Sequence, residues 1–304
     1  MGLLPTPLQY FLEVARTGSI SEASERLHVA TSAISRQIAK LEQDVGAPLF
    51  ERRPRGMVLS EAGEILAAYA RRSSLEAEQV LAEVHGVHAL SRSTVKIASS
   101  EGFARELLPE AITTFREKHP GVRFRLNVTG PGAATQQVRD GTVDLAVTYS
   151  LAPEKDIKVE YSQQQPIYVL MADDHPLAKR ADIDLAELLE FPLALPNEDT
   201  TIRQLFDIYV ALEGLSFEPA FVSNYSGALQ SFARQRGGVT LIGSLTVRRR
   251  LKIDRLAIVP IRNAELRRRS VQIQSMARRT LPPAVRAFLT HLIELINSGG
   301  ERRR

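Results

Sequence analysis

The sequence predicts a multidomain chain that is α-helical at its N-terminal end and α/β over the rest of its length. Apolar residues recur at helical spacing up to residue 45, and a long stretch without proline follows. Beyond residue 93, short apolar runs alternate with amphipathic helices. A chain of 304 residues is long enough for two or three domains, each with its own core.

Three helices are expected before the first basic turn. The first covers residues 8–17, the second is short and capped by Ser19 or Ser21, and the third covers residues 31–45 with Gly46 just past its end. Two short helices joined by a tight turn, the second exposing polar side chains near its N-terminus, are typical of a helix-turn-helix whose second helix enters the major groove of DNA.

The pattern of residues 48–59 predicts a strand, a basic turn and a second strand, which together form a wing that meets phosphates or the minor groove. The alternative is a small helical subdomain with a solvated arginine loop, because helix-turn-helix periodicity alone is a weak signal. The candidate DNA-binding residues are Thr31, Ser32, Ser35, Arg36, Gln37 and Lys40 on the helix, with Arg52, Arg53 and Arg55 on the wing.

A long helix is expected over residues 61–90, with Ser60 as its N-cap. Such a helix is too long to be covered by its own small domain, so its apolar stripe must pack against a second subunit or, alternatively, across the following domain. His85 and His88 lie three residues apart on it. Without a nearby carboxylate or cysteine, they are more typical of solvated side chains than of a metal site.

Strands and helices alternate after the polar segment 91–93, as in a doubly wound fold. The expected strands are 95–98, 122–128, 143–147, 167–171, 193–195, 217–222, 239–242 and 271–273, and the expected helices are 103–118, 134–139, 201–212, 226–234 and 283–296. The chain leaves the first unit near 163–165 and returns near 269–270, which predicts two lobes with a cleft between them. Lobe I covers about 94–164 and 270–304, and lobe II about 165–269.

Short motifs in residues 11–63 carry a resemblance to a known family. They are Phe-Leu-Glu-Val-Ala at 11–15, Gly-Ser at 18–19, Ala-Ser-Glu-Arg-Leu at 23–27, Ser-Arg-Gln-Ile at 35–38, Leu-Glu at 41–42, Gly46, Leu-Phe-Glu-Arg at 49–52 and Ser-Glu-Ala-Gly at 60–63. This set resembles the N-terminal signature of the LysR-type transcriptional regulators. One departure is that Ala30 and Thr31 stand where many members have Ser or Thr and then Gln or Pro.

The resemblance implies a winged helix-turn-helix DNA-binding domain (1–59), a linker helix for dimerisation (60–90) and a two-lobed effector-binding domain (94–304) similar to periplasmic solute-binding proteins. It implies double-stranded operator DNA and a small-molecule effector as partners, with RNA polymerase as a further candidate. It also implies a homo-oligomer, dimeric through the linker helix and tetrameric through the lobes.

Hydroxyl groups, an amide and free backbone N–H groups follow strand ends and precede helices in both lobes, where anions and ligands of open α/β sheets collect. In the family, the positions matching Ser99, Ser100, Thr129 and Thr201 line the effector pocket. We therefore expect a small carboxylate effector in the cleft, although the same side chains could merely cap helices. The candidate effector-binding residues are Ser99, Ser100, Thr129, Gly130, Thr200, Thr201 and Asn224.

Composition narrows the function classes. The chain has no cysteine and six scattered histidines, and it lacks the common nucleotide and nucleophile motifs, so no enzyme, cofactor or metal site is predicted. It has no run of eighteen apolar residues and no signal-peptide pattern, so a cytoplasmic protein without a membrane partner is expected. The alternative function is a cytoplasmic solute-binding or sensor protein that uses its helix-turn-helix for protein contacts.

Charge is unevenly distributed. Residues 1–60 carry 7 basic against 6 acidic side chains, residues 61–245 carry 17 against 25, and residues 246–304 carry 15 against 4. The basic C-terminal tract could contact DNA phosphates or meet the acidic middle of a neighbouring subunit. The tract consists of 13 of these 15 basic residues: Arg248, Arg249, Arg250, Lys252, Arg255, Arg267, Arg268, Arg269, Arg278, Arg279, Arg302, Arg303 and Arg304.

Overall fold

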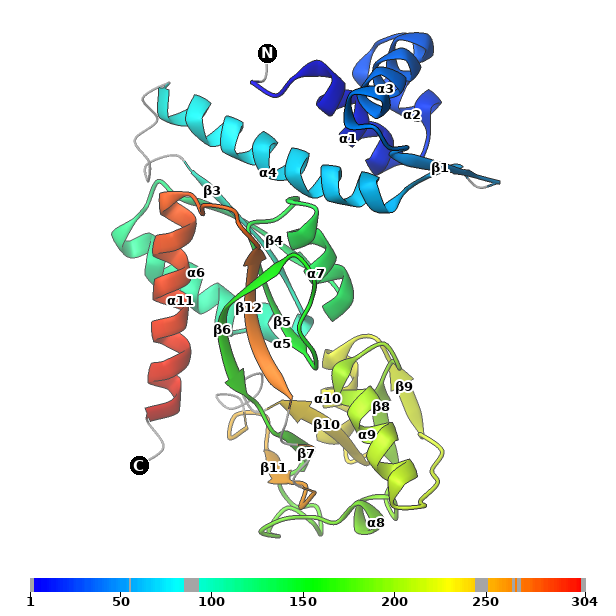
Figure 1. The fold of residues 1–304 in the computed structure, drawn as a ribbon. Helices are drawn as coiled ribbons and strands as arrows, with labels where there is room; N and C mark the ends of the chain where they lie inside the picture. The colour runs from blue at the N-terminus through cyan, green and yellow to red at the C-terminus, as the bar shows by residue number, and fades with distance from the viewer. Residues whose placement is uncertain are drawn as a thin grey trace.

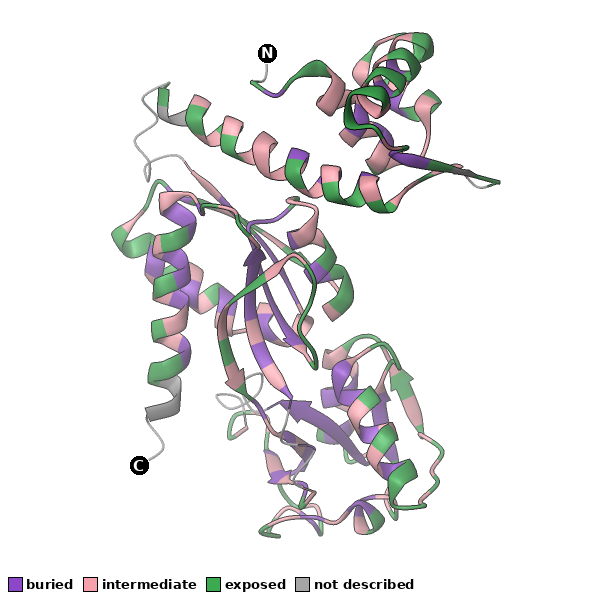
Figure 2. Ribbon diagram, viewed as in Figure 1, coloured by how far each residue is buried: buried purple, intermediate pink, exposed green. Residues whose placement is uncertain are grey.

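A computed structural model describes residues 3–54, 56–84, 93–243, 251–263, 266 and 269–301. A small N-terminal domain lies beside one long helix, and two α/β lobes follow below them (Figure 1). Buried residues concentrate in the two central sheets and on the inner faces of their helices (Figure 2). The predicted fold class, a helix-turn-helix with a long helix and a two-lobed α/β domain, is confirmed.

The N-terminal domain is built of three helices and a two-stranded wing. Its elements are α1 (Thr6–Thr17), α2 (Ile20–Leu27), α3 (Thr31–Val45), β1 (Phe50–Arg53) and β2 (Gly56–Leu59). Phe11, Ile34 and Leu49 are fully buried in its core. The strands pair antiparallel, with Phe50 opposite Leu59, so the predicted strand–turn–strand pattern is confirmed. Burying apolar side chains from all three helices and β1 is what fixes the angle between α2 and α3.

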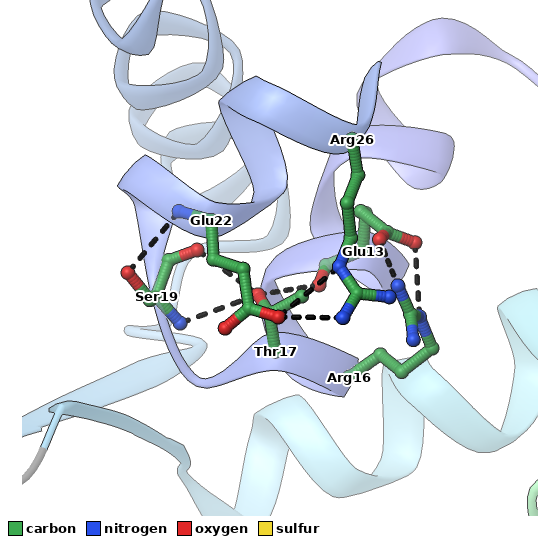
Figure 3. A network of polar contacts seen from close by, with 6 residues as sticks. All are labelled: Glu13, Arg16, Thr17, Ser19, Glu22 and Arg26. Carbon is green, nitrogen blue, oxygen red and sulfur yellow. Dashed lines mark hydrogen bonds and ion pairs between the residues drawn. The ribbon is translucent and has the colours of Figure 1, made fainter.

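A polar network closes the turn between α1 and α2 (Figure 3). The Thr17 hydroxyl donates to the Glu13 carbonyl at 2.9 Å and accepts from the Ser19 N–H at 3.3 Å. The Ser19 side chain accepts from the Glu22 N–H at 3.3 Å, so Ser19 and not Ser21 is the N-cap of α2. Glu13 pairs with Arg16, raising the pKa of that guanidinium, and the Glu22 carboxylate pairs with Arg26 at 2.6 Å. The Thr17–Ser19 bond joins the end of α1 to the start of α2, and each ion pair lies within one helix.

The long helix α4 (Glu61–Val84) begins at the predicted position. Ser60 is its N-cap, because the Ser60 hydroxyl accepts from the Gly63 N–H at 3.0 Å. Its first half packs on the N-terminal domain. Farther along, Arg71 lies 3.4 Å from the Asp140 carboxylate, and Leu75 packs into the core of lobe I. The helix therefore contacts the domain that follows it in the same chain, which was the alternative to packing against a second subunit. Residues 85–90 of the expected helix, with His85 and His88, lie outside the described residues.

Lobe I is a five-stranded mixed sheet in the order β4-β3-β5-β12-β6. Helices α6 and α11 cover one face, around Phe115 and Phe288, and α7 covers the other, around Ala98 and Val138. Its elements are β3 (Thr94–Ser99), α5 (Glu101–Ala104), α6 (Leu107–Lys118), β4 (Arg123–Val128), α7 (Pro131–Arg139), β5 (Leu145–Ser150), β6 (Ile157–Gln164), β12 (Ser270–Met276) and α11 (Pro283–Glu301).

Lobe II is a second five-stranded mixed sheet, in the order β11-β7-β10-β8-β9. Its elements are β7 (Ile167–Ala172), α8 (Leu185–Leu188), β8 (Leu193–Pro196), α9 (Thr201–Leu212), β9 (Phe221–Ser223), α10 (Ser226–Arg234), β10 (Val239–Gly243) and β11 (Leu256–Pro260). The chain crosses between the sheets twice, and the two crossings touch where the Gln165 N–H donates to the Arg269 carbonyl at 2.7 Å.

Several predicted elements were wrong in extent. The expected helix 103–118 is two helices, α5 and α6, and the expected strand 217–222 is reduced to β9 because Pro219 cannot donate to a sheet ladder. Strands β6 and β11 and the short helix α8 were not predicted at all. In β6, exposed and half-buried residues are mixed without a continuous apolar run, so the sequence carries little strand signal there.

Candidate functional site

The outward face of α3 carries the polar residues named from the sequence. Ile34 and Ile38 are buried on its inner face. Thr31, Ser32, Ser35, Arg36 and Lys40 are exposed, and Gln37 is half-buried. The helix begins at Thr31 as expected, but Ala30 precedes it without a side-chain cap. The face is therefore open to a large partner along its N-terminal half.

The wing is an antiparallel hairpin of β1 and β2. Arg53 is exposed and pairs with Glu51 at 2.9 Å. Arg55 and the side chain of Arg52 lie outside the described residues. The Arg53 guanidinium must therefore exchange this weak surface pair for a phosphate if it is to contact DNA, at small cost, because exposed ion pairs contribute little.

A cavity of about 660 Å³ lies between the two lobes. Lobe I supplies the residues that follow β3 and β4, and lobe II supplies the start of α9, the start of α10 and strand β10. Six of the predicted effector-binding residues line it: Ser100, Thr129, Gly130, Thr200, Thr201 and Asn224. Residues up to 124 positions apart in the sequence, Ser100 and Asn224, are thus brought to one site, as expected for the carboxyl ends of strands.

Ser99 does not line the cavity, which corrects the expectation for this residue. It is the last residue of β3 and fully buried, and its hydroxyl donates to the Ser100 carbonyl at 2.9 Å. Since side chains alternate across a strand, Ser99 and Ser100 cannot both face the same side. Ser100 does line the cavity, and its hydroxyl lies 3.0 Å from the Thr148 hydroxyl.

Thr200 has a second task at the cavity. Its hydroxyl accepts from the Arg203 N–H at 3.4 Å and donates to the Asn197 carbonyl at 2.8 Å, so it caps α9. The alternative expectation of a helix cap therefore describes Thr200. The predicted hydroxyls of Thr129 and Thr201, which also belong to the lining, cap neither α7 nor α9.

Two contacts across the cavity were missed in the sequence. The Glu101 carboxylate of lobe I accepts from the Ser226 N–H at 2.6 Å and from the Gly227 N–H at 3.4 Å, at the N-terminus of α10 in lobe II. Beside it, Arg105 donates to the Gln230 side-chain oxygen at 2.6 Å. We call these contacts the interlobe latch. Partners so distant along the chain leave no local pattern, so no signal in one sequence could have found them.

Three buried residues of the lining, Tyr149, Thr240 and Arg269, carry polar groups, and we call them the cavity floor. The Arg269 guanidinium carbon lies 3.7 Å from the centre of the Tyr149 ring. Burial lowers the pKa of Arg269 and raises the pKa of Tyr149, in each case because the charged form is poorly solvated. In the sequence, Arg269 is one of three consecutive arginines, so nothing distinguished it from Arg267 and Arg268.

The rest of the basic tract is only partly described. Arg248–Arg250, Arg267, Arg268 and Arg302–Arg304 lie outside the described residues. Arg279 is buried and pairs with the Asp144 carboxylate at 2.9 Å, within the core of lobe I. Arg269 and Arg279 are therefore not available for the contacts with DNA or a neighbouring subunit that were considered for this tract, because their side chains are buried.

Neither a metal site nor a membrane span emerges from the described part of the chain. No cluster of three or more His, Asp or Glu side chains there could hold a metal ion. None of the helices in that part is both long and apolar enough to cross a membrane.

A helix-turn-helix joined by a long helix to two lobes around a cavity defines the class of ligand-responsive DNA-binding regulators. Two family models cover the chain: the bacterial regulatory helix-turn-helix protein of the lysR family matches residues 6–64, and the LysR substrate binding domain matches residues 88–296. The chain belongs to the LysR family of transcriptional regulators, and it is a regulator and not an enzyme.

Individual relatives agree with this assignment. The chain is 29% identical over 284 residues to the RuBisCO operon transcriptional regulator of Allochromatium vinosum, covering 92% of each protein. Full-length OxyR C199D from Pseudomonas aeruginosa has a TM-score of 0.68 at 22% identity, over 94% of this chain and 93% of that one. The effector binding domain of QuiR in complex with shikimate has a TM-score of 0.57 at 18% identity, over 68% of this chain and 99% of that one. The two structures share the fold of this chain.

Proposed function

We propose that the chain binds paired operator half-sites through α3 and the wing, and that a small carboxylate bound between the lobes changes this binding. The observation that carries the proposal is the interlobe cavity, which gathers Ser100, Thr129 and Thr201 beside the N-termini of α7, α9 and α10. Hydroxyl donors and helix N-termini favour anions. The effector binding domain of QuiR, which shares this fold, is in complex with shikimate, and shikimate carries a carboxylate. That complex supports a carboxylate as the ligand class.

The proposal divides the chain into a DNA-binding domain (1–59), a linker helix (60–90) and an effector-binding domain (94–304). It assigns base contacts to the exposed face of α3, and phosphate or minor-groove contacts to Arg52, Arg53 and Arg55. The cytoplasm is the compartment in which such a protein meets its operator. RNA polymerase is a candidate partner on the family resemblance alone.

Operator binding tests the role of α3. Arg36→Ala is expected to weaken binding by roughly 10- to 100-fold, because a base contact contributes about 1–3 kcal/mol. Sequence preference at one base pair should relax at the same time. Arg236→Ala, which removes an exposed arginine of lobe II, is the matched control and should bind as the wild type does. Gel shifts with the DNA upstream of the gene measure both, and unchanged binding by Arg36→Ala would contradict the groove assignment.

Induction tests the cavity. Ser100→Ala together with Thr129→Val is expected to abolish the transcriptional response to a carboxylate found in a thermal-shift screen, while operator binding without effector persists. Losing two hydroxyl contacts costs about 1–3 kcal/mol, or roughly 10- to 100-fold in affinity. Ser150→Ala, in the same lobe but outside the cavity lining, is the control. A double variant that is induced normally would remove the cavity from the effector pathway.

We further propose that α4 pairs two subunits. Ile65, Tyr69, Val80 and Val84 on this helix are 66%, 53%, 48% and 75% exposed, more apolar surface than one helix normally presents to water. Tyr69→Glu with Val80→Glu is expected to weaken the dimer by at least about tenfold, because like charges would face each other in a desolvated interface. Sedimentation equilibrium measures the effect. A wild-type chain that sediments as a monomer at micromolar concentration would contradict the pairing.

A further inference from the structure

The cavity floor holds four polar atoms that have no hydrogen-bond partner among the described residues. They are Nε and Nη2 of Arg269, the Tyr149 hydroxyl and the Thr240 hydroxyl. The three residues are 3%, 8% and 1% exposed, respectively, and all line the interlobe cavity. Buried polar atoms are nearly always paired, so unpaired donors gathered in one place point to a missing acceptor.

The Arg269 charge is also uncompensated. Among the described lining residues, Arg269 is the one cation, and the two carboxylates are Glu101 and Asp199. Glu101 is engaged in the interlobe latch, and Asp199 is exposed beside Gly130 on the rim. The Tyr149 ring stacks on the guanidinium but carries no formal charge. A buried guanidinium without a counterion is costly, and an anionic ligand would remove that cost.

The two unpaired nitrogens of Arg269 suit a carboxylate. Nε and Nη2 lie on one edge of the planar guanidinium, and their N–H groups are parallel, so they can donate to both oxygens of a carboxylate at once. Gly243 leaves room for this edge. A Cβ at position 243 would lie 2.6 Å from Nη2 and 2.6 Å from the Tyr149 hydroxyl, so any side chain there would collide with the floor.

The floor lies at the junction of the lobes. Tyr149 belongs to β5 of lobe I, and Thr240 and Gly243 belong to β10 of lobe II. Arg269 itself lies in the second crossing, where its carbonyl accepts from the Gln165 N–H of the first crossing. An anion held here would touch both sheets and the hinge between them. The donor atoms are buried, so the anion must enter as Tyr149 and β10 separate.

We propose that Arg269 is the charge-recognising residue of the cavity, binding the carboxylate of a hydroxylated organic acid through Nε and Nη2, with the Tyr149 and Thr240 hydroxyls as further donors. The remaining hydroxyl groups of that acid would then face Ser100, Thr129 and Thr201. This assignment rests on the proposed function of the cavity as the effector site. It adds which residue selects for negative charge and where in the cavity the carboxylate lies.

Acetate, a carboxylate with only a methyl group attached, is the probe. We expect acetate to raise the melting temperature of the full-length protein saturably at constant ionic strength in chloride, and acetamide, its neutral counterpart, to have no effect. Arg269→Gln should weaken acetate binding by at least about tenfold, because charge-assisted hydrogen bonds are lost. Tyr149→Phe, which keeps the ring, should weaken it several-fold. Arg236→Gln is the control and should respond as the wild type does.

The assignment is overturned if wild-type protein does not distinguish acetate from acetamide, or if Arg269→Gln keeps the wild-type response. Should Arg269→Gln fail to fold, Tyr149→Phe and Thr240→Val decide the question in the same assay. The induction assay separates this failure from that of the cavity itself. Normal induction of Arg269→Gln with lost induction of the Ser100/Thr129 double variant would refute only the role of Arg269. Normal induction of both would refute the cavity as effector site.

Discussion

Alanine at position 63 is expected to unfold the N-terminal domain and abolish operator binding, while both lobes stay folded. Gly63 lies in the first turn of α4 against the residue before β1, and a Cβ there would lie 2.0 Å from the Leu49 carbonyl oxygen and 3.0 Å from Leu59 Cδ2. The same carbonyl accepts from the Ser60 N–H at 3.0 Å, so the backbone cannot retreat without losing that bond. The overlap should cost about 3 kcal/mol or more, a large part of the stability of a small domain.

Gly132→Ala is the matched control. Gly132 lies in the first turn of α7, and a Cβ there meets nothing within 4 Å. Because alanine favours helix by about 1 kcal/mol over glycine, this variant should be unchanged or slightly more stable. Calorimetry and gel shift measure the two variants. A Gly63→Ala protein that melts and binds operator as the wild type does would show that α4 and β1 do not pack this closely.

Removing the interlobe latch is expected to have a similarly large effect, in this case on the response of the protein to its effector. Glu101→Ala deletes both bonds from the Glu101 carboxylate to the N-terminus of α10. Such bonds contribute roughly 2–3 kcal/mol, so the equilibrium between close and separated lobes should shift by about 30- to 150-fold towards separation. Since we propose that lobe separation admits the effector, the variant should bind acetate more readily and regulate without full dependence on effector.

The absence of cysteine from the chain makes this shift measurable. Spin labels on Lys118→Cys and Gln204→Cys, exposed on α6 and α9, report the distance between the lobes when labelled chains are diluted into unlabelled protein. Glu117→Gln, exposed on α6, should leave the distance distribution unchanged. An identical distribution for Glu101→Ala and wild type would mean that the latch does not hold the lobes together.

Helices with clear ends were the part of the fold that the sequence predicted best. Helix α3 runs from Thr31 to Val45 as expected, because Ile34 and Ile38 set its period and Gly46 ends it in the left-handed conformation. Helices α9 and α10 also have their expected bounds. Strands without an apolar run, such as β6, could not be predicted, because their stability comes from pairing with β12, far along the chain.

The candidate effector site was predicted only at its rim. Ser100 and Thr129 follow strands and precede helices, so local patterns could place them at the cavity. Ser99 differs from Ser100 by one position, and strand alternation turns it inward. Glu101 and Arg269 depend on partners on other elements, Ser226 and Tyr149, that only the folded chain brings near. The two charged residues, Glu101 and Arg269, could therefore not be assigned to the cavity from the sequence.

Helix α7 has a consequence for how signals travel through the molecule. Its N-terminal end, at Gly130 and Pro131, lines the cavity, and its C-terminal end touches α4 through the Asp140–Arg71 ion pair. There Gly141, with a positive φ of 70°, lets Leu75 of α4 pack closely. A nine-residue helix is about 13 Å long and does not bend appreciably. We therefore expect α7 to move as a rigid body. A ligand that displaces its N-terminal end would then also displace the linker helix at its C-terminal end, together with the DNA-binding domain attached to that helix.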